Sequence, residues 1–239
     1  QSAKTPLYRY LSTTPRNLVL PVPQFNILNG GKHAQGSTDF QEFMVIPIGL
    51  TTFADALRCG SEIYASLGKI LRGRGLNTNV GDEGGFAPEL ETNRKALDLL
   101  VDAVEAAGYK PQEQVCLGMD VAATELYQEG NYVLEREGKN LSSNELTKLY
   151  DDLSHEFPLL SIEDGLAEDD WAGWQSLHST LEGRVQLVGD DLYTTNPQRI
   201  QRGVDQNASN AVLIKLNQIG TLTETLEAIH LTHKSGWAA

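Results

Sequence analysis

The sequence has few cysteines, no long apolar run and less positive than negative charge. Its two cysteines, Cys59 and Cys116, form no C-x-x-C motif and have no histidine cluster beside them. This arrangement argues against a disulfide framework or a zinc site, and it predicts two buried thiols in a reducing compartment. The longest uncharged stretch, residues 17–31, contains two prolines and is shorter than the roughly 18 apolar residues of a transmembrane helix.

The charge balance limits the kinds of partner that the protein can have. Lysine and arginine total 19, whereas aspartate and glutamate total 32, which gives a formal net charge of −13. General binders of nucleic acid or anionic membranes use clustered lysine and arginine, so we expect neither nucleic-acid binding nor membrane insertion. No signal peptide is recognisable, and the polar start at Gln1 is interpreted as a cut or processed end. Together with the reduced thiols, this predicts a cytoplasmic protein.

Length and composition indicate an ordinary globular protein. The chain has 239 residues, of which 40% are hydrophobic and 21% are charged. Such a chain can bury a full core without disulfides, and its length allows one or two domains, including a single α/β barrel.

A strand–helix unit repeats from about residue 92 onward, to judge from apolar spacing and turn signals. Buried strands are expected at residues 115–119, 159–162, 185–189 and 211–214. Helices are expected at residues 94–108, after the capping box at Ser142, at residues 169–181, from Pro197, and after a second capping box at Thr221. This alternation predicts a parallel sheet with helices packed outside it.

Two further parts of the sequence carry expectations about local structure. Leu222, Leu226 and Ile229 follow Thr221 at helical spacing and are expected to face the core. The first 90 or so residues are less regular. They predict strands at residues 18–28 and 40–48, a helix at residues 53–71 and a glycine-bearing loop at residues 73–88.

Three of the predicted strands end in acids, namely Asp120, Glu163 and Asp190, and a fourth ends in Lys215. Successive βα units place these residues on one rim, at the carboxyl end of the sheet. Three converging carboxylates repel one another unless a cation lies between them, and oxygen ligands without His or Cys favour Mg²⁺. For any one of these acids taken alone, the alternative to a metal ligand is a residue that caps the next helix or a side chain in water.

Lys215 and two glycine-rich loops add candidate catalytic groups. Lys215 lies between apolar neighbours, so burial is expected to lower its pKa and make it a possible base, although a lone lysine after a strand is often a surface residue. Glu83 lies in the loop Gly-Asp-Glu-Gly-Gly, and His33 lies in the loop Asn-Gly-Gly-Lys-His; a plain turn and an exposed histidine are the alternatives. Gln41 and Glu42 form a polar pair inside the second predicted strand.

Seven motifs, in order along the chain, resemble those of the enolase family. They are residues 25–33 (FNILNGGKH), 39–44 (DFQEFM), 79–88 (NVGDEGGFAP), 118–120, 161–171 (SIEDGLAEDDW), 189–192 with 195–200 (TNPQRI), and 213–222 (LIKLNQIGTL). The resemblance implies a reversible dehydration of 2-phosphoglycerate to phosphoenolpyruvate in glycolysis.

The resemblance also implies a role for each candidate residue. Asp120, Glu163 and Asp190 ligate the catalytic Mg²⁺, and Lys215 removes the C2 proton of the substrate. Glu83 is the acid that assists departure of the C3 hydroxide, and Glu42 belongs to the same network. Gln41 contacts the substrate, and His33 lies on a loop that closes over it. Because nearby anions disfavour a charged carboxyl, we expect a raised pKa for Glu83.

The implied fold is an enolase-type α/β barrel, a TIM-like (β/α)8 barrel with the order ββαα(βα)6, incomplete in this chain. Residues 1–239 are expected to be a single barrel domain truncated within the seventh strand. The family's amino-terminal domain, a phosphate-gripping loop and a second catalytic lysine have no counterpart here. We therefore expect these residues alone to have little or no hydratase activity, and the full-length protein to be a homodimer or a higher homo-oligomer.

Two other functions compete with the leading interpretation. One is a different superfamily enzyme, such as a racemase or cycloisomerase. Glu83 and the Gln41–Glu42 pair disfavour it, because such enzymes usually carry a Lys-x-Lys motif on an early barrel strand. The other is a non-catalytic binding or scaffold role, including display at the cell surface.

Overall fold

A curved six-stranded sheet organises the computed structural model, which describes residues 4–12, 18–34 and 36–239. Its strands, in spatial order, are β1 (Phe25–Asn29), β2 (Glu42–Ile46), β3 (Cys116–Asp120), β7 (Leu159–Glu163), β8 (Gln186–Gly189) and β9 (Ala211–Val212). The pairs β1–β2 and β2–β3 are antiparallel, whereas the pairs β3–β7, β7–β8 and β8–β9 are parallel. Among the described residues β1 and β9 do not pair, so the barrel is open, as the sequence predicted.

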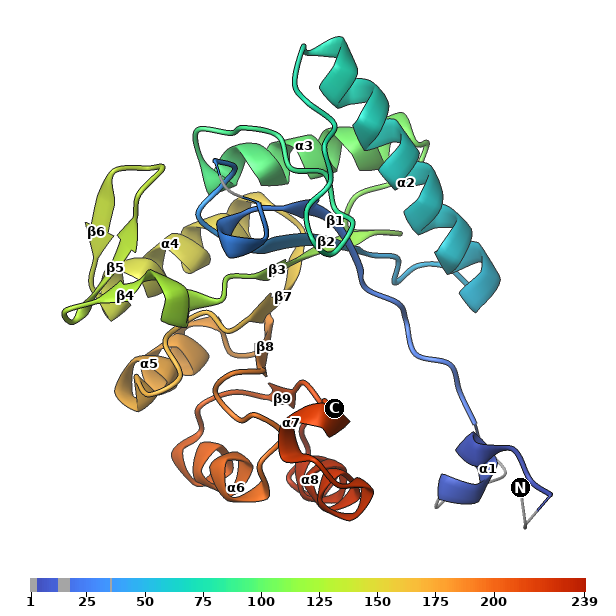
Figure 1. Cartoon of the computed structure of the whole chain (residues 1–239), viewed down its shortest axis with the longest axis vertical. Helices are drawn as coiled ribbons and strands as arrows, with labels where there is room; N and C mark the ends of the chain where they lie inside the picture. Colours follow the sequence, from blue (N-terminus) through green and yellow to red (C-terminus); the bar gives the residue numbers. More distant parts are fainter. Residues whose placement is uncertain (1–3, 13–17, 35) are drawn as a thin grey trace.

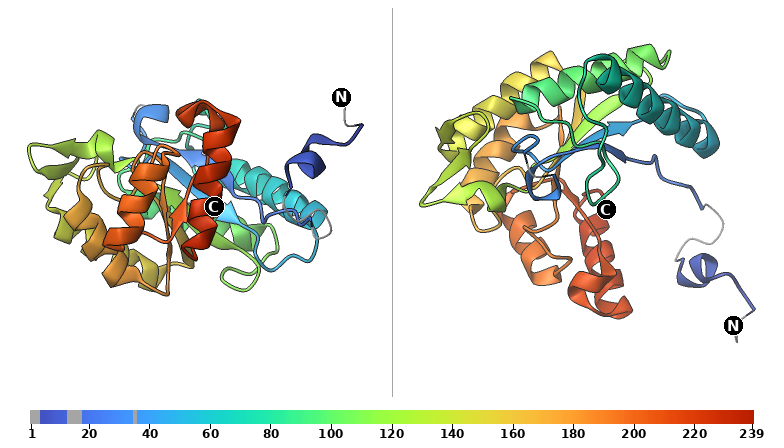
Figure 2. Two further views of the ribbon diagram at one scale, coloured as in Figure 1. Left: turned by 90° about the horizontal axis from the view of Figure 1, so that it is seen from below. Right: turned by 45° about the horizontal axis from the view of Figure 1, so that its top comes forward.

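Helices cover the outer side of the sheet, which forms an arc in Figure 2. They are α2 (Phe53–Gly73), α3 (Asn93–Ala106), α4 (Ser143–Glu156), α5 (Trp171–Leu181), α6 (Pro197–Gln206) and α8 (Leu222–Lys234). The single-turn helix α7 (Leu216–Ile219) lies between β9 and α8 in the chain and has no buried residue. The order β1, β2, α2, α3 before the βα repeat confirms the enolase-type topology. A short helix, α1 (Leu7–Leu11), stands apart from this body at the end of an extended segment (Figure 1).

The helix starts follow the sequence signals that predicted them. At α4, the Ser142 hydroxyl accepts the Glu145 amide while the Glu145 carboxylate accepts the Ser142 amide, which completes the capping box. Thr221 caps α8 through the Glu224 amide, and Pro197 occupies the first turn of α6. Each cap satisfies amide groups that a helix start leaves without partners, so the boundaries of these helices could be predicted to within a few residues.

The first predicted strand is shorter than expected. Only Phe25–Asn29 pairs, whereas residues 18–24 are extended and mostly exposed, with Val19 87% exposed. Pro21 and Pro23 lack an amide hydrogen, and no described segment pairs with this stretch, so it cannot form a ladder. The strand expected at residues 40–48 begins at Glu42 and ends at Ile46. It ends there because the next residue, Pro47, has no amide hydrogen to donate.

The carboxyl-terminal part also differs in detail. The strand expected at residues 211–214 is paired only over Ala211–Val212, and Ala238 lies parallel to it, accepting the Val212 amide at 2.9 Å. The buried side of α8 is formed by Thr225, Ala228 and Thr232, while Leu222 and Leu226 are exposed. The expected leucine face is therefore wrong. Both threonine hydroxyls donate to carbonyls one turn earlier, which lets them be buried without an unmet hydrogen bond.

Several smaller features complete the fold. Two short 3₁₀ helices are present, η1 (Gly31–His33) after β1 and η2 (Ala123–Leu126) after β3. A small sheet that the sequence did not predict follows η2, formed by β4 (Tyr127–Gln128), β5 (Asn131–Leu134) and β6 (Lys139–Leu141). Cys59 and Cys116 are buried free thiols, as predicted. None of the helices in the described ranges is long and apolar enough to cross a membrane. The interpreted cut end at Gln1 lies outside the described residues.

Candidate metal and active site

A cavity of about 750 Å³ opens at the carboxyl ends of the parallel strands. Every residue that the sequence assigned to the site borders it. These residues are His33, Gln41, Glu42, Glu83, Asp120, Glu163, Asp190 and Lys215. They come from seven separate segments of the chain, so it is the fold that brings them together.

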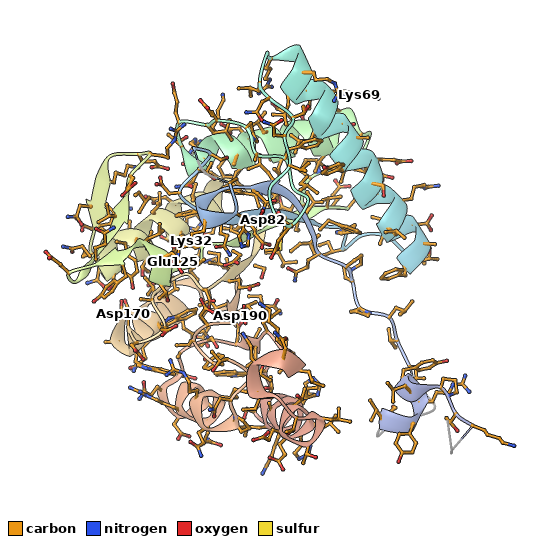
Figure 3. All side chains as sticks on the ribbon, in the orientation of Figure 1. Lys32, Lys69, Asp82, Glu125, Asp170 and Asp190 are labelled. Atoms are coloured by element: carbon orange, nitrogen blue, oxygen red, sulfur yellow. The ribbon has the colours of Figure 1, made fainter. Side chains whose placement is uncertain are left out.

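The acids lie at equivalent ends of neighbouring strands. Asp120 and Glu163 are the last residues of β3 and β7 and are paired in register, and Asp190 directly follows β8. Figure 3 shows Asp190 at this end of the sheet, beside the carboxyl-terminal helices. One oxygen of Asp120 accepts the Ala122 amide at 2.9 Å, and the other accepts the Gln41 side-chain amide at 3.3 Å.

Burial makes the charged state of these acids costly. Burial, with the charges of Asp190 and Asp191 adding to it, raises the pKa of Asp120 to about 7. Burial and the nearby Asp120 charge raise the pKa of Glu163 well above its usual value. A divalent cation would remove both penalties, and an oxygen-only ligand set suits Mg²⁺. The donor set therefore fits this metal.

The acids group somewhat differently from the predicted triad. Asp120, Glu163 and Asp164 each offer an oxygen within 4.8 Å of the others, and so do Asp164, Asp190 and Asp191. Asp164 belongs to both groups and was not assigned a role from the sequence. The sequence shows two consecutive acids, Glu163 and Asp164, at the end of this strand, but it does not show which of them is a metal ligand and which supports the site.

Lys215 follows β9 in the chain and contacts the acid that follows the neighbouring strand β8. Its ammonium group donates to Asp190 Oδ2 at 2.5 Å, and Gln218 donates to Asp190 Oδ1 at 2.7 Å. Burial, the largest single influence, lowers the pKa of Lys215, but the contact with Asp190 and the charges of Glu163 and Asp120 together raise it above its usual value. The lowered pKa expected from the sequence is therefore wrong for the metal-free chain, because the acids outweigh the apolar neighbours.

Glu42, Glu83 and His33 form a second group on the cavity wall, with ligand atoms within 4.8 Å of one another. Burial and a hydrogen bond with Glu83 raise the pKa of Glu42 to about 9. The same hydrogen bond is the main influence that lowers the pKa of Glu83. The expected rise for Glu83 is therefore wrong. Glu42 is the more buried partner, with 13% of its side chain exposed, so it keeps the proton that the two carboxyl groups share.

The loop that carries Glu83 is pinned to β1. Its backbone closes on itself through Gly81 and Gly85, and Phe86 exchanges backbone hydrogen bonds with Ile27 and Asn29 on the strand. A Cβ at position 85 would lie 2.5 Å from Asn29 Oδ1 and 3.0 Å from the Leu28 amide, so glycine is needed for the loop to approach so closely. Glu83 is thus held at the cavity by backbone contacts on both sides of the loop.

The loop with His33 directly follows β1 and lies close to the Glu83 loop, since a Cβ at position 81 would lie 2.8 Å from the His33 carbonyl oxygen. His33 Nδ1 lies 3.8 Å from Glu42 Oε1, and it has no hydrogen-bond partner in the part of the chain that the structure describes. The preceding residue, Lys32, forms an ion pair with Glu125 of η2, and the two side chains are adjacent in Figure 3. The ion pair ties the His33 loop to the segment after β3.

The arrangement combines a candidate cation site, an amine and a carboxyl pair that shares one proton. Such a set can hold an anionic substrate and both remove and deliver protons on it. A family described as "Enolase, C-terminal TIM barrel domain" matches residues 17–239, which is nearly the whole chain. The order of strands and helices and the acids at the strand ends agree with that match, and the chain belongs to the family of enolase C-terminal barrel domains.

Proposed function

We propose that this chain is the barrel of an enolase, a Mg²⁺-dependent hydro-lyase that interconverts 2-phosphoglycerate and phosphoenolpyruvate. The observation that carries the proposal is the shared cavity, which brings Lys215 and the Glu42–Glu83 pair around the strand-end acids. A dehydration needs a base for one carbon and an acid for the leaving hydroxide on the next. Both kinds of group border this cavity.

Asp120, Glu163 and Asp190 would hold the Mg²⁺ ion through carboxylate oxygens. The bound ion would stabilise the negative charge that develops on the substrate carboxylate when the neighbouring C–H bond breaks. As ligands, Asp120 and Glu163 would be in the deprotonated form, because only the charged carboxylate is a good donor.

Lys215 is the proposed base for the C2 proton. In the metal-free chain its ammonium form is favoured by Asp190, 2.5 Å away. Once the negative charge of the acids is neutralised, burial acts on the amine with less opposition and favours the neutral form. Nζ can then accept the proton, and 44% of the Lys215 side chain is exposed, so the amine can move toward a substrate in the cavity.

Glu83 is the proposed acid for the C3 hydroxide, and Glu42 holds the proton that Glu83 passes on. The raised pKa of Glu42, about 9, keeps one proton in the pair at neutral pH. Glu83 is exposed at the cavity, and transfer from Glu42 along their hydrogen bond would supply it with a proton to deliver. Gln41 and His33, on the same wall, are proposed to contact the substrate.

The direct test is the conversion of 2-phosphoglycerate to phosphoenolpyruvate, followed by the ultraviolet absorption of the product with and without Mg²⁺. Since the resemblance assigns the phosphate grip to further segments, the assay is run on this chain and on any longer protein that contains it. Mg²⁺-dependent product formation that Lys215→Ala abolishes would support the proposal. Absence of product from both forms would contradict it.

The rival within the superfamily leaves a different chemical signature. A racemase would change the configuration at C2 and keep the C3 hydroxyl group, so no alkene would form. Proton NMR of the reaction mixture separates the two outcomes, because loss of the hydroxide creates two new vinyl protons. Epimerised substrate without vinyl signals would replace the enolase proposal with the racemase one.

A further inference from the structure

We propose that Asp164 is a positioning residue, which fixes the main chain at Asp190 and Asp191 so that the Asp190 carboxylate faces the cavity. The inference rests on the proposed function, since Asp190 is one of the three proposed Mg²⁺ ligands. It adds a residue that neither the sequence motifs nor the family match assigns.

Both carboxylate oxygens of Asp164 hold the main chain after β8. Oδ1 accepts the Asp190 amide at 3.0 Å, and Oδ2 accepts the Asp191 amide at 2.8 Å. Two hydrogen bonds from consecutive amides to one carboxylate set the orientation of the peptide between them, because hydrogen bonds to a charged acceptor are strong and directional.

The backbone of Asp164 is fixed as well. Its amide donates to Val188 of β8 at 3.0 Å, and its carbonyl accepts the Ala123 amide of η2 at 3.0 Å. Its φ angle of 42° lies in the left-handed region, which a non-glycine residue adopts only where the surroundings hold it. Asp164 therefore joins the ends of β7 and β8 to the segment that follows β3, and each of these three strands ends at or directly before a proposed ligand.

Asp164 borders the same cavity as Asp190, and both acids are buried, but the oxygens of Asp164 are already engaged. Binding an ion with either of its oxygens would compete with an amide hydrogen bond to the main chain. Asp190, by contrast, uses its oxygens on the Lys215 and Gln218 side chains, which can move away when a ligand or ion binds. The two neighbouring acids thus have different tasks: Asp190 faces the cavity, and Asp164 faces the main chain that supports Asp190.

The test compares Asp164→Asn with Asp191→Asn. The first variant keeps the shape of the side chain but replaces one acceptor oxygen with an NH₂ group, so it cannot accept both amides. The second removes a charge from the same acidic group and leaves both amide hydrogen bonds intact, which makes it the electrostatic control. Residues that support metal ligands typically change metal affinity by about 10- to 100-fold.

Two readouts are measured. In the metal-free protein, hydrogen exchange at the Asp190 and Asp191 amides is expected to be at least about tenfold faster in Asp164→Asn than in the wild type and in Asp191→Asn. In calorimetric Mg²⁺ titrations, Asp164→Asn is expected to bind about 10- to 100-fold more weakly than Asp191→Asn. Equal exchange and equal affinity in the two variants would overturn the proposal.

A measurement on the wild type keeps the proposal testable if Asp164→Asn does not fold. The Asp190 and Asp191 amides are expected to be protected to the same degree as the amides of β8, and exchange as rapid as that of exposed loop amides would overturn the role of Asp164. Because this measurement uses no metal, its result does not depend on whether the proposed function is correct. A wild-type chain that binds no Mg²⁺ would contradict the enolase proposal instead.

Discussion

Replacing Asp190 with alanine is expected to remove the stabilisation of this chain by Mg²⁺. Asp190 borders the same cavity as Asp120 and Glu163, and its loss leaves these two acids without their third proposed partner. The metal-free protein also changes, because Lys215 and Gln218 lose an acceptor while the repulsion felt by Asp120 declines. The informative quantity is therefore the difference with and without Mg²⁺ within each variant.

The size of the effect follows from binding linkage. A ligand at about 100 times its dissociation constant stabilises the folded state by about 2.7 kcal/mol. In a domain of about this length, each kcal/mol raises the melting temperature by about 2–4 °C, so Mg²⁺ is expected to raise that of the wild type by about 5–11 °C. A hundredfold weaker site at the same Mg²⁺ concentration would keep only about 0.4 kcal/mol, or about 1–2 °C.

The assay is thermal unfolding followed by circular dichroism, in chelator and in Mg²⁺. Asp205→Ala is the matched control, because Asp205 is an exposed acid on α6 and does not border the cavity. The control should keep the full Mg²⁺ shift. Equal shifts in Asp190→Ala and the wild type, or no shift in the wild type, would refute the metal site at these strand ends.

Three further predictions concern the carboxyl pair, a close glycine contact and the core. The folded-state pKa of Glu42, about 9, exceeds its ordinary 4.5, so the stability it contributes is fully present below pH 4.5 and is lost as pH rises toward 9. Urea unfolding of the metal-free protein should show that loss, at up to about 1.4 kcal/mol per pH unit, and Glu42→Gln should flatten it; an unchanged slope would place the proton elsewhere. Gly30→Ala should lower the free energy of unfolding by about 1–3 kcal/mol in the same assay, because a Cβ there would lie 1.9 Å from Thr38 Oγ1 and 2.3 Å from the Phe40 carbonyl oxygen. An unchanged free energy of unfolding would mean that the loop can move to make room for the methyl group. Trp174→Ala should cost about 3–5 kcal/mol, because the side chain is fully buried; a loss below about 1 kcal/mol would show that the core refills the space.

The positions of the site residues could be predicted from the sequence because parallel strands share one direction. Once each βα unit is recognised, the acids at the ends of β3, β7 and β8 must lie on one rim, and the structure places them there. The same reasoning reached Lys215 after β9. These inferences needed only the order and direction of the strands, which can be predicted once apolar runs identify the strands and capping signals identify the helices between them.

The properties of these residues could not be predicted in the same way. The pKa of Lys215 depends on a 2.5 Å contact with Asp190 that outweighs burial only together with the charges of Asp190, Glu163 and Asp120, and the location of the shared proton depends on which of Glu42 and Glu83 is more buried. The role of Asp164 depends on two specific amide hydrogen bonds. Distances and burial of this kind are set by packing, which sequence spacing does not contain.

Some elements of the fold were missed for local reasons. The strand expected at residues 18–28 is unpaired over residues 18–24, which include two prolines and have no pairing segment among the described residues. In α8, leucines and threonines lie on different faces, and apolar character alone selected the exposed leucine face. The small sheet β4–β6 is short and partly exposed, so its alternation was too weak to recognise.

The central claim is that Lys215 removes the C2 proton of 2-phosphoglycerate in this cavity. It is tested most directly by NMR of 2-phosphoglycerate in D₂O with Mg²⁺, which follows deuterium incorporation at C2 independently of hydroxide loss. Wild type and Lys148→Ala, whose lysine is an exposed residue of α4, are predicted to exchange this hydrogen at equal rates. Lys215→Ala is predicted to be slower by about 10²–10⁴-fold, the usual contribution of a general base. Exchange by Lys215→Ala at the wild-type rate would contradict the account.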